Sequence, residues 1–176
     1  MNDYLRVYTS SDVVGVELGA ALKNVIALCA GVCDGLGYGD NTIAMLMTRG
    51  LSEMAGLCGS MGGRKETLAG LAGLGDLIVT CTSRHSRNRR AGVFIGKGME
   101  VQEAMRQVGA VVEGYYAAKA AHELSVKMGV DMPISNEAYK VLYEGKDPSV
   151  AIRELMSRSR KAEIVDEVGA VNWVND

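Results

Sequence analysis

The arrangement of apolar and polar residues along this chain is helical almost throughout. In successive stretches the apolar residues fall on one face of an α-helix, or on nearly every face. Glycine-rich segments and capping residues separate these stretches, and both prolines stand where helices are expected to start. The predicted helices cover residues 14–33, 41–57, 65–71, 101–108, 114–128 and 133–142, with further helix starts near Ser86 and at Asp147–Pro148.

The first of these stretches, Val14–Cys33, is apolar on nearly every helical face and follows Asp12, a residue suited to an N-cap. It is long enough to span a bilayer. However, Glu17, Lys23 and Asn24 lie near its middle, and a charge at the centre of a membrane helix costs about 2.5 to 3.5 kcal/mol. We therefore expect a central helix covered by other helices, and no membrane contact.

One short strand is expected, at the very start of the chain. Leu5–Ser10 (LRVYTS) has the β-branched and aromatic composition of a strand, and no other convincing strand follows. After the first helix the glycine-rich GLGYGDN supplies a turn, in which Asp40 or Asn41 is expected to cap the second helix. With 22 glycines and 2 prolines, the sequence predicts one all-α unit of closely packed helices with a residual N-terminal strand.

Composition narrows the classes of partner. The formal net charge of −2 gives no overall attraction toward nucleic acid, and aromatic residues make up only 5% of the chain. The chain has no charged-then-apolar leader, so a cytoplasmic location is expected. The cysteines form no CxxC pair and have no histidine-rich neighbourhood, so we expect buried free thiols and no metal site. They are Cys29, Cys33, Cys58 and Cys81.

Lys23 is the first candidate for chemistry. It lies in an apolar helix with no acidic residue three or four positions away, so its partner must come from elsewhere in the fold. An amine that loses hydration in apolar surroundings is suited to proton transfer. The alternative is a lysine that extends its amine to solvent or pairs with a distant carboxylate.

The segment SRHSRNRRAG is strongly basic within a chain of negative total charge. Arginine can bond two oxygens of one phosphate, and Ser86, Asn88 and the free N–H groups of a helix start could supply further donors. The segment therefore indicates a phosphate-sized anion site, although such a run is often only a solvated face. Its arginines are Arg84, Arg87, Arg89 and Arg90.

Two acidic residues are weaker candidates, and two histidines are set aside. Asp76 follows GLG and precedes an apolar run, so it could orient Lys23, bond a substrate hydroxyl or cap a helix. Glu113 could complement a helix dipole. His85 and His122 have no partner at a triad or ligand spacing, so neither is given a catalytic role.

The glycine motifs do not predict a nucleotide-binding fold. Neither GLGYGD nor GLGD forms the G-x-G-x-x-G turn between a first strand and a helix, and no acidic residue ending a second strand follows. The chain is therefore expected to lack a complete dinucleotide-binding domain.

Four blocks in the same order resemble the carboxy-terminal domain of the bacterial-type NAD(P)-dependent glycerol-3-phosphate dehydrogenase family. The resemblance runs from about Leu5 to about Glu163. It implies an all-α, multi-helix fold like the C-terminal domain of 6-phosphogluconate dehydrogenase. The blocks are RVYTSSDVVGVELGAALKNVIALCAG, GLGYGDNTIAMLMTRGLSEM, LAGLGDLIVTCTSRHSRNRRAG, and VVEGYYAAK with MPISNEAYKVLYEGKDP.

The resemblance implies reversible hydride transfer between NAD or NADP and a small phosphorylated triose, feeding phospholipid synthesis. The triose is sn-glycerol 3-phosphate or dihydroxyacetone phosphate. Lys23 matches the family's catalytic lysine and acts with Asp76; Thr80 is a weaker candidate nearby. The matching substrate-binding positions are Lys23, Asp76, Ser86, Arg87 and Asn88, and the matching cofactor-binding positions are Arg87, Val111 and Glu113.

The resemblance also implies what the chain lacks. The main NAD or NADP site is expected in an N-terminal Rossmann domain outside this chain, so the chain alone is expected to be inactive, and the choice between NADH and NADPH is not encoded here. Residues 1–11 are expected to be the remnant of that domain's last strand, frayed or paired between chains, followed by a helical substrate-binding domain at 12–164 and a tail at 165–176. A homodimer is a further expectation.

Two alternatives stay open from the sequence. One is the helical domain of a related dehydrogenase acting on another small acid or sugar. The other is a non-catalytic helical dimerisation module, which predicts that Lys23 is ordinarily exposed and that Asp76 and Arg87 lie on different faces. Convergence of these side chains on one concavity would favour the enzyme.

Overall fold

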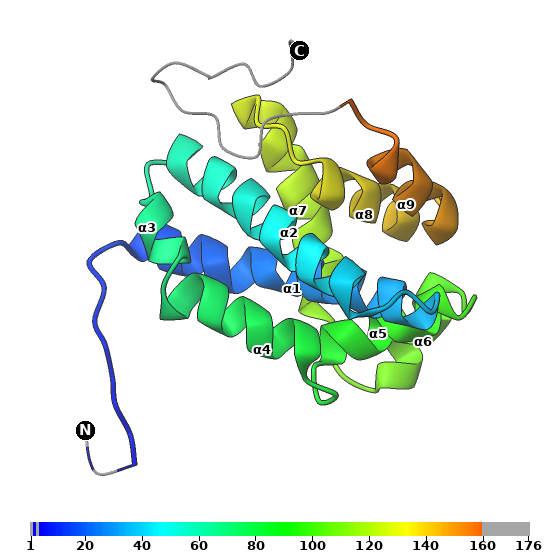
Figure 1. The fold of residues 1–176 in the computed structure, drawn as a ribbon, viewed down its shortest axis with the longest axis horizontal. Helices are drawn as coiled ribbons and strands as arrows, with labels where there is room; N and C mark the ends of the chain where they lie inside the picture. Colours follow the sequence, from blue (N-terminus) through cyan, green and yellow to red (C-terminus); the bar gives the residue numbers. More distant parts are fainter. Residues whose placement is uncertain (1, 3, 160–176) are drawn as a thin grey trace, which may run out of the picture.

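The structure is a computed structural model that describes residue 2 and residues 4–159, and the described chain is helical (Figure 1). Its only β-type pairing is a single bridge between Asn2 and Leu5. The expected all-α architecture is therefore confirmed. The elements are α1 (Val13–Gly35), α2 (Asp40–Ser60), α3 (Lys65–Leu68), the π-helical turn η1 (Leu71–Gly75), α4 (Asp76–Thr82), α5 (Arg87–Gly96), α6 (Val101–Val108), α7 (Glu113–Met128), α8 (Pro133–Tyr143) and α9 (Pro148–Met156).

Helix α1 is the central helix of the domain, as predicted. It runs between α2 on one side and α4 and α5 on the other (Figure 1). Ile26 on one face belongs to a core shared with α2 and α4, while Val25 on the other face belongs to a second core with α5 to α8. By length and composition α1 could cross a membrane, but burial on two sides explains why it is apolar nearly all round.

Glycines let α1 and α5 approach each other backbone to backbone. A Cβ added at Gly31 would lie 2.0 Å from the Arg89 carbonyl oxygen, and one added at Gly92 would lie 2.0 Å from the Leu28 carbonyl oxygen. No side chain fits at such distances. The expectation that glycine serves close helix packing is confirmed here, and this packing places the start of α5 beside the middle of α1.

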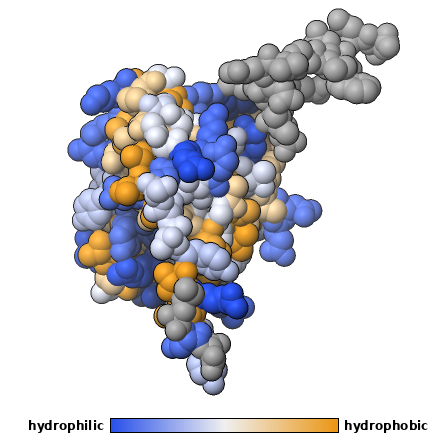
Figure 2. Space-filling model, turned by 90° about the vertical axis from the view of Figure 1, so that its left-hand side faces the viewer, coloured by the Kyte–Doolittle hydropathy of each residue, from blue (hydrophilic) through white to orange (hydrophobic). Residues whose placement is uncertain are grey.

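The expected N-terminal strand is not formed. Residues 6–10 have no regular secondary structure, and Leu5, Val7 and Tyr8 are exposed. A strand needs a partner for its backbone groups, and the described residues offer none beyond the Asn2–Leu5 bridge. At the end of the molecule to the left in Figure 1, hydrophobic residues lie in scattered groups among hydrophilic ones (Figure 2).

Most predicted helices are confirmed, and three details are wrong. Gly39, and neither Asp40 nor Asn41, precedes α2 as its N-cap. The third helix ends at Leu68, because the chain leaves the helix at Gly70 and continues as η1. Helix α4 was not predicted.

Tertiary packing explains α4. Its residues Ile78, Val79 and Thr80 are β-branched and weak helix formers. However, Leu77 and Cys81, one turn apart, are buried in the core shared with α1 and α2. Burial on that face outweighs the local preference.

The helix caps at Asp12 and Asp147 lie where the sequence predicts them. Asp12 accepts a hydrogen bond from Gly15 N at 2.9 Å, and the Asp147 side chain accepts hydrogen bonds from backbone N–H groups in the first turn of α9.

All four cysteines are free, as expected. Burial raises the pKa of Cys33 to about 11 and that of Cys81 to about 12, so neither thiol ionises near neutral pH.

The described residues include only some of the predicted domain boundaries. Helical structure begins at Val13 and the last described helix ends at Met156, and the expected start of the helical domain at residue 12 stays a prediction. The expected domain end at 164 and the expected tail at 165–176 lie outside the described residues.

Candidate functional site

Lys23 on α1 is paired with Asp76, the first residue of α4. The Lys23 amine donates to the Asp76 carboxylate, and the two side chains are 18% and 36% exposed. The Thr80 hydroxyl, one turn along α4, donates to the Asp76 backbone carbonyl at 2.6 Å and lies 3.3 Å from its carboxylate. Lys23 therefore finds its counter-charge across the fold, as its isolation within α1 required.

Lys23 lines a pocket together with residues at the starts of α5 and α7. Most of the predicted site residues line this pocket. Asp76 is not in the lining but is paired with Lys23, and Val111 is exposed outside the lining. The pocket is open to solvent on one side. Its lining residues are Ala20, Lys23, Asn24, Val79, Thr80, Ser83, His85, Ser86, Arg87, Asn88 and Glu113.

The start of α5 presents several hydrogen-bond donors to this pocket. Ser86 is the N-cap, and its hydroxyl accepts from Arg89 N at 3.3 Å. The backbone N–H groups of Arg87 and Asn88 have no acceptor among the described residues. Free N–H groups and the positive end of the helix dipole favour an anion at this place.

Arg87 and Glu113 form an ion pair across the pocket. The Arg87 guanidinium lies 2.6 Å from the Glu113 carboxylate, and the side chains are 45% and 42% exposed. Glu113 is the first residue of α7, where a carboxylate is favoured by the helix dipole. The pair therefore joins the starts of α5 and α7 within the lining of the pocket.

Asn88 fixes the spacing of the three helices that form the pocket. It is buried; its amide donates to Asn24 Oδ1 at 2.8 Å and accepts from Gly114 N at 2.7 Å. A Cβ at Gly114 would lie 2.4 Å from the Asn24 carbonyl oxygen, so glycine is required there. Asn24 was missed as a site residue, although it is adjacent to Lys23 in the sequence.

The basic segment does not act as one cluster. Arg89 points to the end of α1, where it pairs with Asp34 at 2.8 Å. Arg84 and Arg90 are exposed and have no ion pair with a described residue. Only Arg87 lines the pocket, so the pocket is basic through one guanidinium, one ammonium and a helix start.

The two histidines differ in their placement. His85, set aside by the sequence reasoning, lines the pocket. His122 is stacked on Tyr139 and bonded to Asn136 at 2.9 Å between α7 and α8. Among residues 2 and 4–159, no group of three potential metal ligands occurs.

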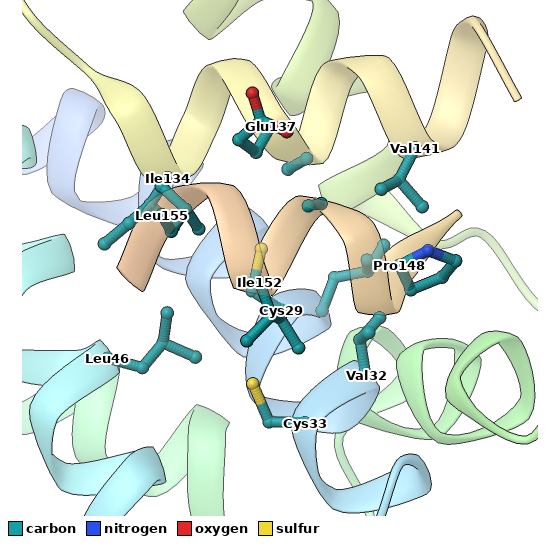
Figure 3. A pocket seen from close by; sticks show the side chains of 13 residues that line it. Cys29, Val32, Cys33, Leu46, Ile134, Glu137, Val141, Pro148, Ile152 and Leu155 are labelled. Atoms are coloured by element: carbon teal, nitrogen blue, oxygen red, sulfur yellow. The ribbon is translucent and has the colours of Figure 1, made fainter. Parts of the chain in front are cut away.

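An apolar hollow on another side of α1 carries none of this chemistry. It lies between α1, α8 and α9 and is lined mainly by aliphatic and sulfur-containing side chains (Figure 3). Its one carboxylate, Glu137, is held by Lys140 and Lys146. The pair with Lys146 ties α8 to the loop before α9, and the pair with Lys140 lies within α8, so Glu137 has a structural role.

The chain is similar to known proteins over most of its length. Residues 12–153 match the family model for the NAD-dependent glycerol-3-phosphate dehydrogenase C-terminus. A Clostridium botulinum (strain Eklund 17B) protein named glycerol-3-phosphate dehydrogenase [NAD(P)+] is 59% identical over 164 residues, covering 93% of this chain and 50% of that protein. A Desulfitobacterium hafniense protein of the same name is 55% identical, covering 97% of this chain and 48% of that protein.

Solved structures agree with this likeness. The crystal structure of glycerol-3-phosphate dehydrogenase from Coxiella burnetii superposes with a TM-score of 0.87 at 44% identity, over 90% of this chain and 49% of that one. The yeast enzyme superposes with a TM-score of 0.80 at 28% identity, over 90% of this chain and 46% of that one. The chain therefore spans about half the length of the relatives it matches.

Proposed function

The chain belongs to the family of NAD-dependent glycerol-3-phosphate dehydrogenase C-terminal domains, and we propose that it supplies the substrate-binding and proton-transfer groups of that reaction. The reaction interconverts sn-glycerol 3-phosphate and dihydroxyacetone phosphate. The observation that carries the proposal is that Lys23, paired with Asp76, opens into the same pocket as Arg87 and the start of α5.

The phosphate of the substrate binds at the start of α5. Arg87 offers a planar pair of donors, and the free N–H groups of Arg87 and Asn88 add two more. The Ser86 hydroxyl lines the same place. The Asn88 amide uses one of its two N–H groups for Asn24, which leaves the second for a phosphate oxygen.

Lys23 handles the proton at the central carbon of the triose. In reduction its ammonium donates to the carbonyl oxygen as negative charge develops there, and in oxidation its amine accepts the hydroxyl proton. The Asp76 carboxylate holds the lysine side chain in place and balances its charge. The nicotinamide of NAD or NADP supplies or accepts the hydride.

The described residues fit a cofactor that is held mainly from outside this chain. Arg87 and Glu113 in the pocket lining, and Val111 outside it, are each more than two-fifths exposed. In contrast, the GLG of residues 73–75 lies in the π-helical turn η1, where it forms no dinucleotide-binding turn. These three residues would touch the cofactor, while the chain alone is expected to turn over no substrate.

The convergence of the site residues supports the enzyme over a non-catalytic helical module. Such a module gives no reason for a largely buried lysine to meet a carboxylate beside a free helix start. A homodimer and a cytoplasmic location stay predictions of the family resemblance.

Reconstitution with the remaining half of a relative tests the proposal. The N-terminal half of the Clostridium botulinum protein, joined to this chain, should reduce dihydroxyacetone phosphate with NADH or NADPH. Lys23→Ala should lower kcat by about 10²- to 10⁴-fold, while Lys119→Ala, an exposed lysine of α7, should leave kcat unchanged. Full activity in Lys23→Ala would remove the proposed mechanism.

A further inference from the structure

An acidic side chain lies where the proposed phosphate would bind. Glu113 lines the pocket and contacts Arg87 at 2.6 Å, although every other charged side chain in the lining that faces the proposed phosphate is basic. Its carboxylate has no other hydrogen-bond or ion-pair partner among the described residues. The Glu113 carboxylate therefore accepts a hydrogen bond from the Arg87 guanidinium, the group proposed to bind the substrate phosphate.

A guanidinium bonded to a carboxylate is not free to bond a phosphate through the same N–H groups. A ligand anion must either displace Glu113 or bind beside it, and in the second case the two anions repel each other. Both cases weaken ligand binding relative to an Arg87 without a partner. Both side chains are more than two-fifths exposed. Water can therefore solvate the displaced Glu113 carboxylate, and breaking the ion pair costs little free energy.

The scaffold of the pocket keeps its shape when this pair opens. Asn88 joins α5 to α7 through Gly114 N at 2.7 Å and joins α5 to α1 through Asn24 at 2.8 Å. The bond to Gly114 is buried, the bond to Asn24 is partly buried, and neither involves Arg87 or Glu113. The ion pair can therefore break without separating the helices that carry it.

We propose that Glu113 is an intramolecular competitor for the anion site at Arg87, so that substrate phosphate binds by displacing its carboxylate. The proposal rests on the proposed function, because it takes Arg87 as the phosphate-binding residue. Glu113 lowers the affinity of the empty pocket for any anion. In the ligand-free pocket Glu113 is paired with Arg87. In the phosphate-bound pocket the Glu113 carboxylate is released from Arg87.

Calorimetric titration of glycerol 3-phosphate into the whole chain tests this. Glu113→Gln should bind the ligand about two- to fivefold more tightly than the unchanged chain, the range expected for an exposed ion pair. Glu123→Gln makes the same charge change at an exposed position of α7, and it should leave the affinity unchanged. In an Arg87→Gln background, Glu113→Gln should give no gain, because the contested guanidinium is gone.

Each outcome has a distinct meaning. Equal affinity of the unchanged chain and Glu113→Gln, with measurable binding in both, overturns the competition and leaves the proposed function intact. A gain that persists in the Arg87→Gln background also overturns it, since the effect would then be general charge repulsion. Absence of binding in every variant overturns the proposed function itself. Glu113→Ala, checked for folding by circular dichroism, should match Glu113→Gln.

Discussion

A methyl group added at Gly92 should separate α1 from α5 and weaken both the fold and the site. The new Cβ would lie 2.0 Å from the Leu28 carbonyl oxygen, whereas ordinary contact begins at 3.4 Å. The obstacle is backbone, so no side chain can rotate away, and the helices must move apart by the difference. Overpacking of this kind typically costs 1 to 3 kcal/mol, and we expect about 3 kcal/mol for Gly92→Ala.

Gly56→Ala is the matched control. Gly56 also lies inside a helix, but a Cβ there meets only Val130 at 3.5 Å, an ordinary contact. Because alanine is a better helix former than glycine, Gly56→Ala should gain up to about 1 kcal/mol. The same chemical change thus has opposite signs at the two positions, for a reason that lies entirely in the α1–α5 contact.

Urea unfolding followed by far-ultraviolet circular dichroism measures both free energies of unfolding. A loss of about 3 kcal/mol corresponds to a fall in Tm of roughly 6 to 12 °C for a domain of this size. Gly92→Ala should also bind glycerol 3-phosphate more weakly, since α5 carries Arg87. If Gly92→Ala is as stable as the unchanged chain, the close approach of α1 and α5 is refuted.

Three further predictions test the pH response, the helix link and the core. Burial raises the pKa of Glu53 to about 7 from an ordinary value of 4.5, so between these values the folded chain holds a proton that the unfolded chain has lost. The free energy of unfolding should therefore fall by up to about 3 kcal/mol as pH rises from about 4.5 to about 7. In Glu53→Gln, the free energy of unfolding measured with urea should change less with pH in this range. An unchanged pH dependence would contradict the assignment of the effect to Glu53. Asn88→Ala leaves the buried Gly114 N–H without its acceptor, so it should lose about 1 to 3 kcal/mol in urea unfolding together with phosphate affinity; an unaltered chain would contradict its linking role. Leu77→Ala empties a fully buried position of α4 and should cost about 2 to 5 kcal/mol in the same assay, whereas a cost below 1 kcal/mol would mean that α4 is not held by the core.

The sequence predicted the parts of the fold that are encoded locally. Asp12 and Pro148 mark helix starts through caps and fixed dihedral angles, and both were predicted correctly. Helix α4 was missed because its β-branched residues favour other conformations, and only the burial of Leu77 and Cys81 makes it helical. Residues 5–10 form no strand although their composition favours one, in line with the expectation that the segment is frayed once its sheet is absent, because composition cannot supply a pairing partner.

The site was predicted unevenly for the same reason. The isolation of Lys23 within its helix required a partner from elsewhere, but only the fold brings Asp76 to it. Charge and spacing alone did not distinguish the four arginines, and only the family resemblance singled out Arg87; in the fold, Arg89 pairs with Asp34 and Arg87 lines the pocket. The ion pair of Arg87 with Glu113 spans two helices, so no local spacing could have indicated it.

The central claim is that one pocket between the middle of α1 and the starts of α5 and α7 binds a triose phosphate, and nuclear magnetic resonance can locate that ligand directly. Titration of glycerol 3-phosphate into the isotope-labelled chain should shift the backbone amides of Arg87, Asn88 and Gly114 most strongly, together with the side-chain amine of Lys23. Shifts confined to the apolar hollow around Cys33 and Ile152, or no shifts at concentrations that saturate an anion site, would contradict the account.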